Sequence, residues 1–89
     1  MRTYELVVVA KTAADTKKLA DTVKGWLGKV KVAKEDDWGQ KPLAYEIKHQ
    51  SAGHYYFMQL ETEEGIPTDL ETKIFRHEDV LRHLLLRTN

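Results

Sequence analysis

Strand-like and helix-like segments alternate along the 89-residue chain, and their order restricts the possible folds more than any other feature of the sequence. The first segment, Tyr4–Ala10, is a β-branched apolar run of strand length. Apolar side chains occur at both alternating sets of its positions, which indicates a strand in the centre of its sheet. A second apolar run, Val80–Arg87, lies near the other end of the chain. The sequence therefore predicts a strand near each end.

The segment after the first strand has the periodicity of an amphipathic helix. Thr12 precedes Asp15 at the spacing of a capping box, which predicts a helix start there. The apolar residues that follow at helical spacing are Leu19, Val23, Trp26 and Leu27. Gly28 is typical of a residue that ends a helix, so the helix is predicted to stop before it.

A shorter helix is predicted before the last strand. Thr68 has Glu71 at capping-box spacing and follows Pro67, a residue that helix starts tolerate. The apolar residues of this segment are Leu70, Ile74 and Phe75. The sequence therefore predicts a short helix that carries these three side chains.

The middle of the chain is predicted to form two strands. Lys29–Glu35 alternates valines with lysines, and apolar character resumes at Leu43–Ile47. A glycine and a proline lie between these halves, at Gly39 and Pro42, which indicates one bent or interrupted strand. Small and polar residues at Gln50–Gly53 predict a turn, and His54–Glu61 is the most strand-like segment of the chain. Together these segments predict a hairpin.

The order strand, helix, strand, strand, helix, strand is that of the ferredoxin-like split β-α-β motif. This motif belongs to the α+β class, and its two helices cover one face of a four-stranded antiparallel sheet. No linker or low-complexity stretch divides the sequence, and 89 residues are too few for two cores. We therefore expect one domain over residues 1–89.

The sheet face that the helices leave open is predicted to carry apolar side chains. Side chains alternate between the two faces of a strand, so this face is fixed once Leu6 is assigned to the helix side. The open face then carries Val7, Val9, Tyr55 and Phe57. Such a patch indicates a protein partner or a platform for stacking bases. The alternatives are that the aromatic rings pack on one another across strands, or that a second copy covers them.

Basic residues are candidates for phosphate contacts. The chain has 14 Lys+Arg and 14 Asp+Glu, so its net charge of zero excludes a surface that is basic throughout. Four arginines fall on or near two strands that this topology makes neighbours: Arg2, Arg76, Arg82 and Arg87. They indicate a phosphate-facing edge, with solvated surface charge as the alternative interpretation.

The chemistry of most enzyme classes is not visible in the sequence. Cysteine is absent, the four histidines are too scattered for a zinc motif, and no glycine-rich phosphate loop occurs. Adjacent acidic pairs in the predicted loops are typical of solvated charge rather than of acid–base catalysis. We therefore predict no enzymatic activity, metal site, cofactor or small-molecule substrate.

The N-terminal segment lacks a signal-peptide pattern and no stretch approaches a membrane span, so we expect a cytoplasmic protein without membrane contact.

Several short segments, taken together and in order, resemble the bacterial small-subunit ribosomal protein six family. The opening reads M-R-x-Y-E, a W-G pair precedes L-A-Y, and an acidic residue followed by V-L-R lies near the end. The segments are Met1–Leu6, Asp37–Gly39, Leu43–Ile47, Gly53–Tyr55 and Phe75–Arg82. No single motif is diagnostic, but the combination is specific and covers nearly the whole chain.

The resemblance implies a structural protein of the ribosome. It would bind the central domain of small-subunit ribosomal RNA as a heterodimer with the eighteenth small-subunit protein. Residues on the family's motifs are then expected to contact RNA, namely Arg2, Tyr4, Lys41, Arg76, Arg82 and Arg87. The open-face residues are expected to contact the partner protein, namely Val7, Val9, Tyr55 and Phe57. These expectations agree with a neutral chain that relies on a second protein for RNA binding.

Two other functions fit the same predicted fold. The first is a stand-alone module for single-stranded RNA, of RRM-like topology, in which Tyr55 and Phe57 stack on bases. The second is a small-molecule regulatory domain that dimerises through its sheets. The first predicts RNA binding without a protein partner, and the second predicts a homodimer with a ligand pocket.

Overall fold

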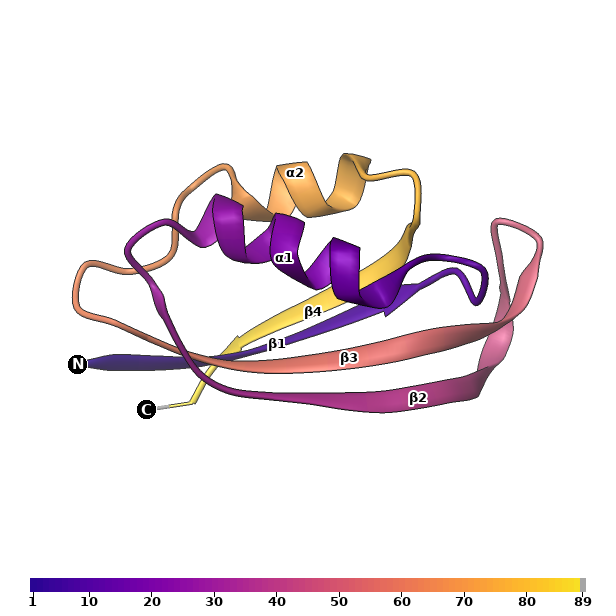
Figure 1. The fold of residues 1–89 in the computed structure, drawn as a ribbon, viewed down its shortest axis with the longest axis horizontal. Coiled ribbons are helices and arrows are strands. Elements are labelled where there is room, and N and C mark those ends of the chain that lie inside the picture. Colours follow the sequence, from indigo (N-terminus) through magenta and orange to yellow (C-terminus); the bar gives the residue numbers. More distant parts are fainter. Residues whose placement is uncertain (89) are drawn as a thin grey trace.

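Two helices cover one face of a four-stranded antiparallel sheet in the computed structural model, which describes residues 1–88 (Figure 1). The elements are β1 (Arg2–Ala10), α1 (Thr16–Leu27), β2 (Lys31–Ile47), β3 (Gln50–Thr62), α2 (Leu70–Arg76) and β4 (Val80–Arg87). The strand order is β2-β3-β1-β4, so β1 and β3 are central and β2 and β4 are edges. This arrangement confirms the predicted ferredoxin-like fold and the central position of the first strand.

The core lies between the sheet and the helices. In the β1–β3 register, Leu6 lies opposite Met58 and Tyr4 lies opposite Leu60. Leu6, Met58 and Leu60 are almost completely buried. The helices complete this cluster with Leu19, Val23, Leu27, Leu70 and Ile74. The predicted assignment of side chains to the two sheet faces is therefore confirmed.

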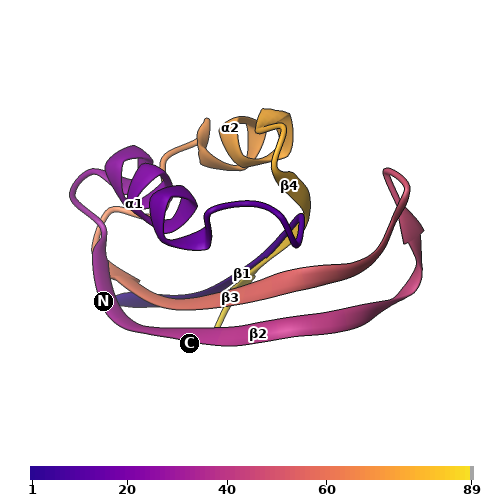
Figure 2. The same ribbon diagram turned by 45° about the vertical axis from the view of Figure 1, so that its right-hand side comes forward.

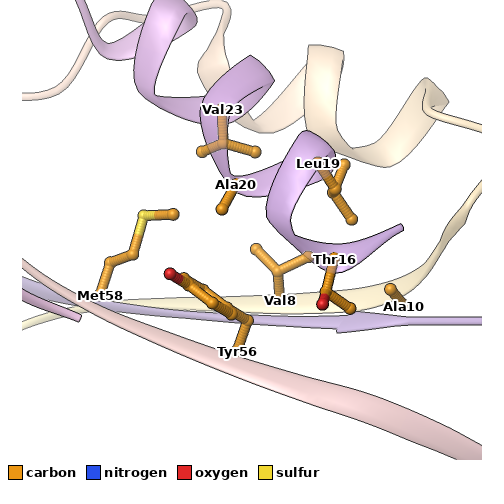
Figure 3. Close-up of a pocket in the computed structure, with 8 residues that line it drawn as sticks. All are labelled: Val8, Ala10, Thr16, Leu19, Ala20, Val23, Tyr56 and Met58. Carbon is orange, nitrogen blue, oxygen red and sulfur yellow. The ribbon is translucent and has the colours of Figure 1, made fainter. Parts of the chain in front are cut away.

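A small void remains between α1 and the sheet (Figure 3). Its volume is about 10 Å³, and mostly apolar side chains line it, including Val8, Val23 and Met58. This volume corresponds to roughly one water molecule, and an apolar cavity of that size stays dry. The void is a packing defect of the core and has no room for a ligand.

Both helices begin later than their capping-box patterns predict. Asp15, rather than Thr12, caps α1, because its side chain accepts a hydrogen bond from the Lys18 backbone N–H at 3.1 Å. The residues before Asp15 form a turn instead. In α2 the cap is Asp69 rather than Thr68. The Asp15 carboxylate explains the start of α1, whereas the Asp69 side chain makes no capping hydrogen bond. The predicted caps were wrong by three residues for α1 and by one residue for α2.

The β2–β3 hairpin also turns at a different place from the predicted one. The turn consists of Lys48 and His49, whose φ angles of 48° and 64° match a two-residue type I′ hairpin turn. The predicted turn at Gln50–Gly53 was wrong, because these residues already pair within β3. Figure 2 shows this hairpin curling beyond the end of β1. The bend predicted for β2 is confirmed, and it arises from shifts of register, one of them at Asp37–Gly39.

A hydrogen-bonded group of three side chains ties α1 to two strands on the helix side. The Lys24 Nζ of α1 lies 2.7 Å from Glu35 Oε1 of β2, and the Tyr56 hydroxyl of β3 donates to Glu35 Oε2 at 2.8 Å. The hydrogen bond from Lys24, followed by that from Tyr56, lowers the pKa of Glu35. Burial, with the Glu35 carboxylate second, raises the pKa of Tyr56 to about 12.

Replacing Glu35 with Gln is expected to lower the free energy of unfolding at neutral pH. The loss relative to the wild type should become smaller at acid pH. The folded-state pKa of Glu35 lies below its ordinary value of 4.5, so its carboxylate stabilises the fold above that pH. The contribution disappears as the pH falls through the lowered pKa. Because the side chain is about a third exposed, we expect at most about 1 kcal/mol at pH 7.

Urea unfolding of wild type and Glu35→Gln between pH 3 and pH 7 measures this difference. The exposed loop variant Glu63→Gln is the control and should change the free energy of unfolding little at any pH. A Glu35→Gln deficit that stays constant, or grows toward acid pH, would contradict the proposed ion pair.

Candidate protein and RNA interfaces

The open face of the sheet is an apolar surface formed by three strands. Val7 of β1 lies between Phe57 of β3 and Leu84 of β4 in the two registers. Leu84 is 46% exposed, and Leu86, two residues further along β4, is 49% exposed. Large apolar side chains that remain half exposed on one sheet face are typical of a surface that a partner covers.

An aromatic stack forms one wall of this surface. The Trp38 ring of β2 lies nearly parallel to the Phe57 ring, with centroids 5.0 Å apart and an interplanar angle of 8°. The Lys41 Nζ lies 5.4 Å from the Trp38 ring centroid and 5.9 Å from that of Tyr55. Phe57 is therefore half-buried rather than uncovered. The alternative that aromatic rings pack across strands holds for this residue, with Trp38 as its partner.

A shift of register in β2 accompanies the position of Trp38. The β2–β3 register shifts between Asp37 and Gly39, and Gly39 has a φ of 79°. The Gly39 N–H donates to Asp37 Oδ1 at 2.8 Å, and His54 Nε2 lies 2.5 Å from the same oxygen. The hydrogen bond from Gly39, with that from His54 second, lowers the pKa of Asp37. The extra residue at this shift is Trp38, whose ring lies on Phe57.

A hollow of about 260 Å³ lies between the aromatic wall and β4. Its lining residues are Val7, Val9, Trp38, Tyr55, Arg82, His83 and Leu84. Val9 is only 3% exposed, so it belongs to the floor of the hollow. Gly53 is its neighbour, and a Cβ atom there would come within 2.5 Å of Val9 Cγ1. The hollow is open to solvent and mostly apolar.

All four residues predicted to bind a protein partner lie on this open face. Val7 and Val9 pair directly with Phe57 and Tyr55 across β1 and β3. Sequence reasoning did not assign Trp38, Leu84 and Leu86 to this site. The run of three leucines near the end of β4 was a signal, because it places apolar side chains on both faces of that strand.

The six residues predicted to bind RNA do not form one surface. Three of them lie at the end of the sheet where β1 begins and β4 ends (Figure 1), namely Arg2, Tyr4 and Arg87. Two lie on the open face near the hairpin end, namely Lys41 and Arg82. Arg76 lies on α2, in the helix layer. The four arginines predicted to form a phosphate-facing edge therefore do not share one edge, because Arg76 belongs to a helix and Arg82 to the open face.

Arg2, Tyr4 and Arg87, which share one end of the sheet, differ in how exposed their side chains are. Tyr4 packs against the hydrophobic core, and Arg87 lies opposite it in the β1–β4 register. The Arg2 guanidinium lies against the loop at Gly65, where a Cβ atom would be 2.7 Å from Nη1. Arg2 and Arg87 are both exposed. They can contact phosphate groups, whereas the Tyr4 ring is partly used for packing.

Three of the four histidines each lie beside a single carboxylate, whereas His77 Nδ1 accepts a hydrogen bond from the Asp79 backbone N–H. Besides His54 with Asp37, His83 Nε2 of β4 lies 3.1 Å from Glu71 Oε1 of α2. Among residues 1–88, no group of three or more His, Cys, Asp or Glu side chains is arranged to hold a metal ion. No helix in the described part of the chain is long and apolar enough to cross a bilayer.

Comparisons with known proteins agree on one family. The family model described as Ribosomal protein S6 matches residues 3–87. The small ribosomal subunit protein bS6 of Mycolicibacterium paratuberculosis is 32% identical, over 100% of this chain and 98% of that protein. That of Alkaliphilus metalliredigens is also 32% identical, over 98% and 97%. The solved structure of 30S ribosomal protein S6 from Thermotoga maritima has the same fold, with a TM-score of 0.88, 22% identity and coverage of 98% and 87%.

Replacing Gly53 with Ala is expected to destabilise the fold and distort the hollow. The added methyl group would collide with Val9, which is buried and cannot move aside cheaply. We expect a loss of about 1–3 kcal/mol in the free energy of unfolding. Gly25→Ala is the matched control, because nothing lies within 4 Å of its Cβ position in α1. It should stabilise the helix by roughly 0.5–1 kcal/mol. Chemical denaturation measures both values, and a Gly53→Ala protein as stable as the wild type would contradict this packing.

Proposed function

Because the chain belongs to the ribosomal protein S6 family, we propose that it is a structural, non-catalytic component of the small ribosomal subunit in the cytoplasm. It binds the central domain of small-subunit ribosomal RNA together with the eighteenth small-subunit protein. Each protein supplies part of the RNA-binding surface. The observation that carries this proposal is the apolar open face of the sheet, which suits a protein partner.

The open face suits a protein partner because leaving its apolar side chains exposed to water is unfavourable in free energy. Leu84 and Leu86 are about half exposed, and Val7, Val9 and Trp38 line the hollow together with Leu84. Burying such apolar area contributes about 25 cal/mol per Å². A partner that covers the face would recover this free energy, whereas an RNA backbone would not.

The end of the sheet near the chain ends suits a limited RNA contact. Arg2 and Arg87 are exposed there, and Tyr4 lies next to Arg87 in the register. A few phosphate contacts give weak, salt-dependent binding, and the net charge of zero adds no long-range attraction. We therefore assign RNA backbone contacts to Arg2, Tyr4 and Arg87, with Arg76 on α2 as a separate contact. The second protein supplies the remaining affinity.

Two geometric features favour this function over the alternatives. A stand-alone RNA module would stack bases on Tyr55 and Phe57, but the Trp38 ring already lies on Phe57. A small-molecule domain would need an enclosed pocket, but the void beneath α1 holds only about 10 Å³ and the larger hollow of about 260 Å³ is open to solvent. The stand-alone RNA module also leaves the exposed leucines of β4 unused.

A gel shift with a central-domain ribosomal RNA fragment tests the proposal. At fixed salt, this protein, the eighteenth protein and their mixture are each titrated. We expect a shift mainly with the mixture. Tight binding by this chain alone to unstructured RNA would support the stand-alone module, and no shift in any mixture would contradict the proposed function.

The double variant Arg2→Gln/Arg87→Gln is expected to weaken RNA binding by the mixture without affecting the protein heterodimer. Each lost phosphate contact should lower the slope of log K against log salt by about 0.7–0.9. Filter binding at several salt concentrations measures the slope, and calorimetry without RNA measures the heterodimer. The same slope in variant and wild type would remove these arginines from the RNA site.

A further inference from the structure

Two cations stand beside the hollow on the open face and come from strands that are not neighbours. Lys41 of β2 lies over the Trp38 and Tyr55 rings that form one wall. Arg82 of β4 lines the opposite side and is paired in register with Val9, which lies in the floor. Both side chains are exposed. The apolar hollow therefore has a positive charge on each side.

The cations beside the hollow have no carboxylate of their own. Among residues 1–88, neither Lys41 nor Arg82 forms an ion pair, although Lys31 and Lys34 of β2 pair with Glu61 and Asp36. None of the residues that line the hollow is acidic. The carboxylates nearest in the β2 sequence are occupied, Asp36 by Lys34 and Asp37 by His54. Apart from the aromatic rings below Lys41, the two positive charges therefore have no described carboxylate to compensate them.

We propose that the partner protein inserts an apolar side chain into this hollow and places a carboxylate, from Asp or Glu, against Lys41 and Arg82. This inference rests on the proposed heterodimer and adds the chemistry of its contact. The apolar side chain would displace water from Val7, Val9 and Leu84. The carboxylate would pair with two cations at the edge of a dry contact, which fixes the orientation of the partner.

A protein carboxylate fits the hollow better than an RNA phosphate does. The floor is aliphatic, and the Phe57 side of the Trp38 ring is already occupied. An RNA phosphate has polar riboses on both sides, which would be desolvated against valine and leucine without hydrogen-bond partners. A carboxylate on a protein surface can lie next to an apolar side chain. The apolar side chain then fills the hollow while the carboxylate contacts the two cations. The expectation that Lys41 and Arg82 contact RNA is replaced by a contact to protein.

Zero-length cross-linking of the heterodimer tests this contact directly. A water-soluble carbodiimide condenses a lysine amine with a carboxylate that touches it, and the carbodiimide becomes a urea. We expect mass spectrometry to identify a peptide in which Lys41 is joined to an Asp or Glu of the eighteenth protein. Lys41→Arg should retain binding and lose this product. Lys17, an exposed lysine of α1, should give no cross-link.

Affinity measurements provide the second readout. Lys41→Gln/Arg82→Gln is expected to bind the partner about tenfold more weakly than the wild type at low salt, with a smaller salt dependence. Lys17→Gln/Lys18→Gln also removes two positive charges, from the exposed side of α1, and should bind like the wild type. Circular dichroism and thermal unfolding check that both variants fold.

The outcomes separate this inference from the function on which it rests. If the wild type binds the partner and both double variants bind equally well without a Lys41 cross-link, the inference is wrong and the heterodimer stands. If Lys41→Gln/Arg82→Gln forms the heterodimer normally but the complex loses RNA affinity, the two cations contact RNA and the inference is again wrong. If the wild type fails to bind the partner, the proposed function itself fails.

Discussion

The register of the two central strands determines which surface of this protein is available to partners. Leu6 lies opposite Met58, and both are buried beneath the helices. Because side chains alternate along a strand, Val7 and Phe57 must then face away from the helices. A slip of one residue would exchange the two sets and turn Glu5 and Gln59, which share the open face with Val7, toward the core. The helix layer and the open face are therefore two consequences of one pairing.

Charges are distributed differently on the two faces. On the helix side, Lys24, Glu35 and Tyr56 satisfy one another and hold α1 against the sheet. On the open face, Lys41 and Arg82 have no acidic partner among the described residues. The first group stabilises the fold of the single chain, whereas the second gains a partner only by association. This difference, together with the half-exposed leucines of β4, is the physical basis for the proposed heterodimer.

The fold and the apolar residues of the open face could be predicted from the sequence, because both depend on local periodicity. The hairpin turn could not, because Lys48 and His49 adopt positive φ without the usual glycine or asparagine. The Trp38–Phe57 stack depends on a shift of register and on pairing between strands. The four arginines lie on different surfaces of the molecule, and the sequence pattern alone did not establish which surface each one occupies. Exposed arginines have no periodicity that reveals this.

Methyl NMR of this chain during titration with unlabelled eighteenth protein tests the central claim most directly. The account predicts that the Val7, Leu84 and Leu86 methyl signals shift or broaden as the heterodimer forms. The methyl groups of Leu70 and Ile74, which α2 buries in the core, should remain unchanged. Changes confined to the helix layer, with the three open-face residues unaffected, would contradict the assignment of this face to the partner.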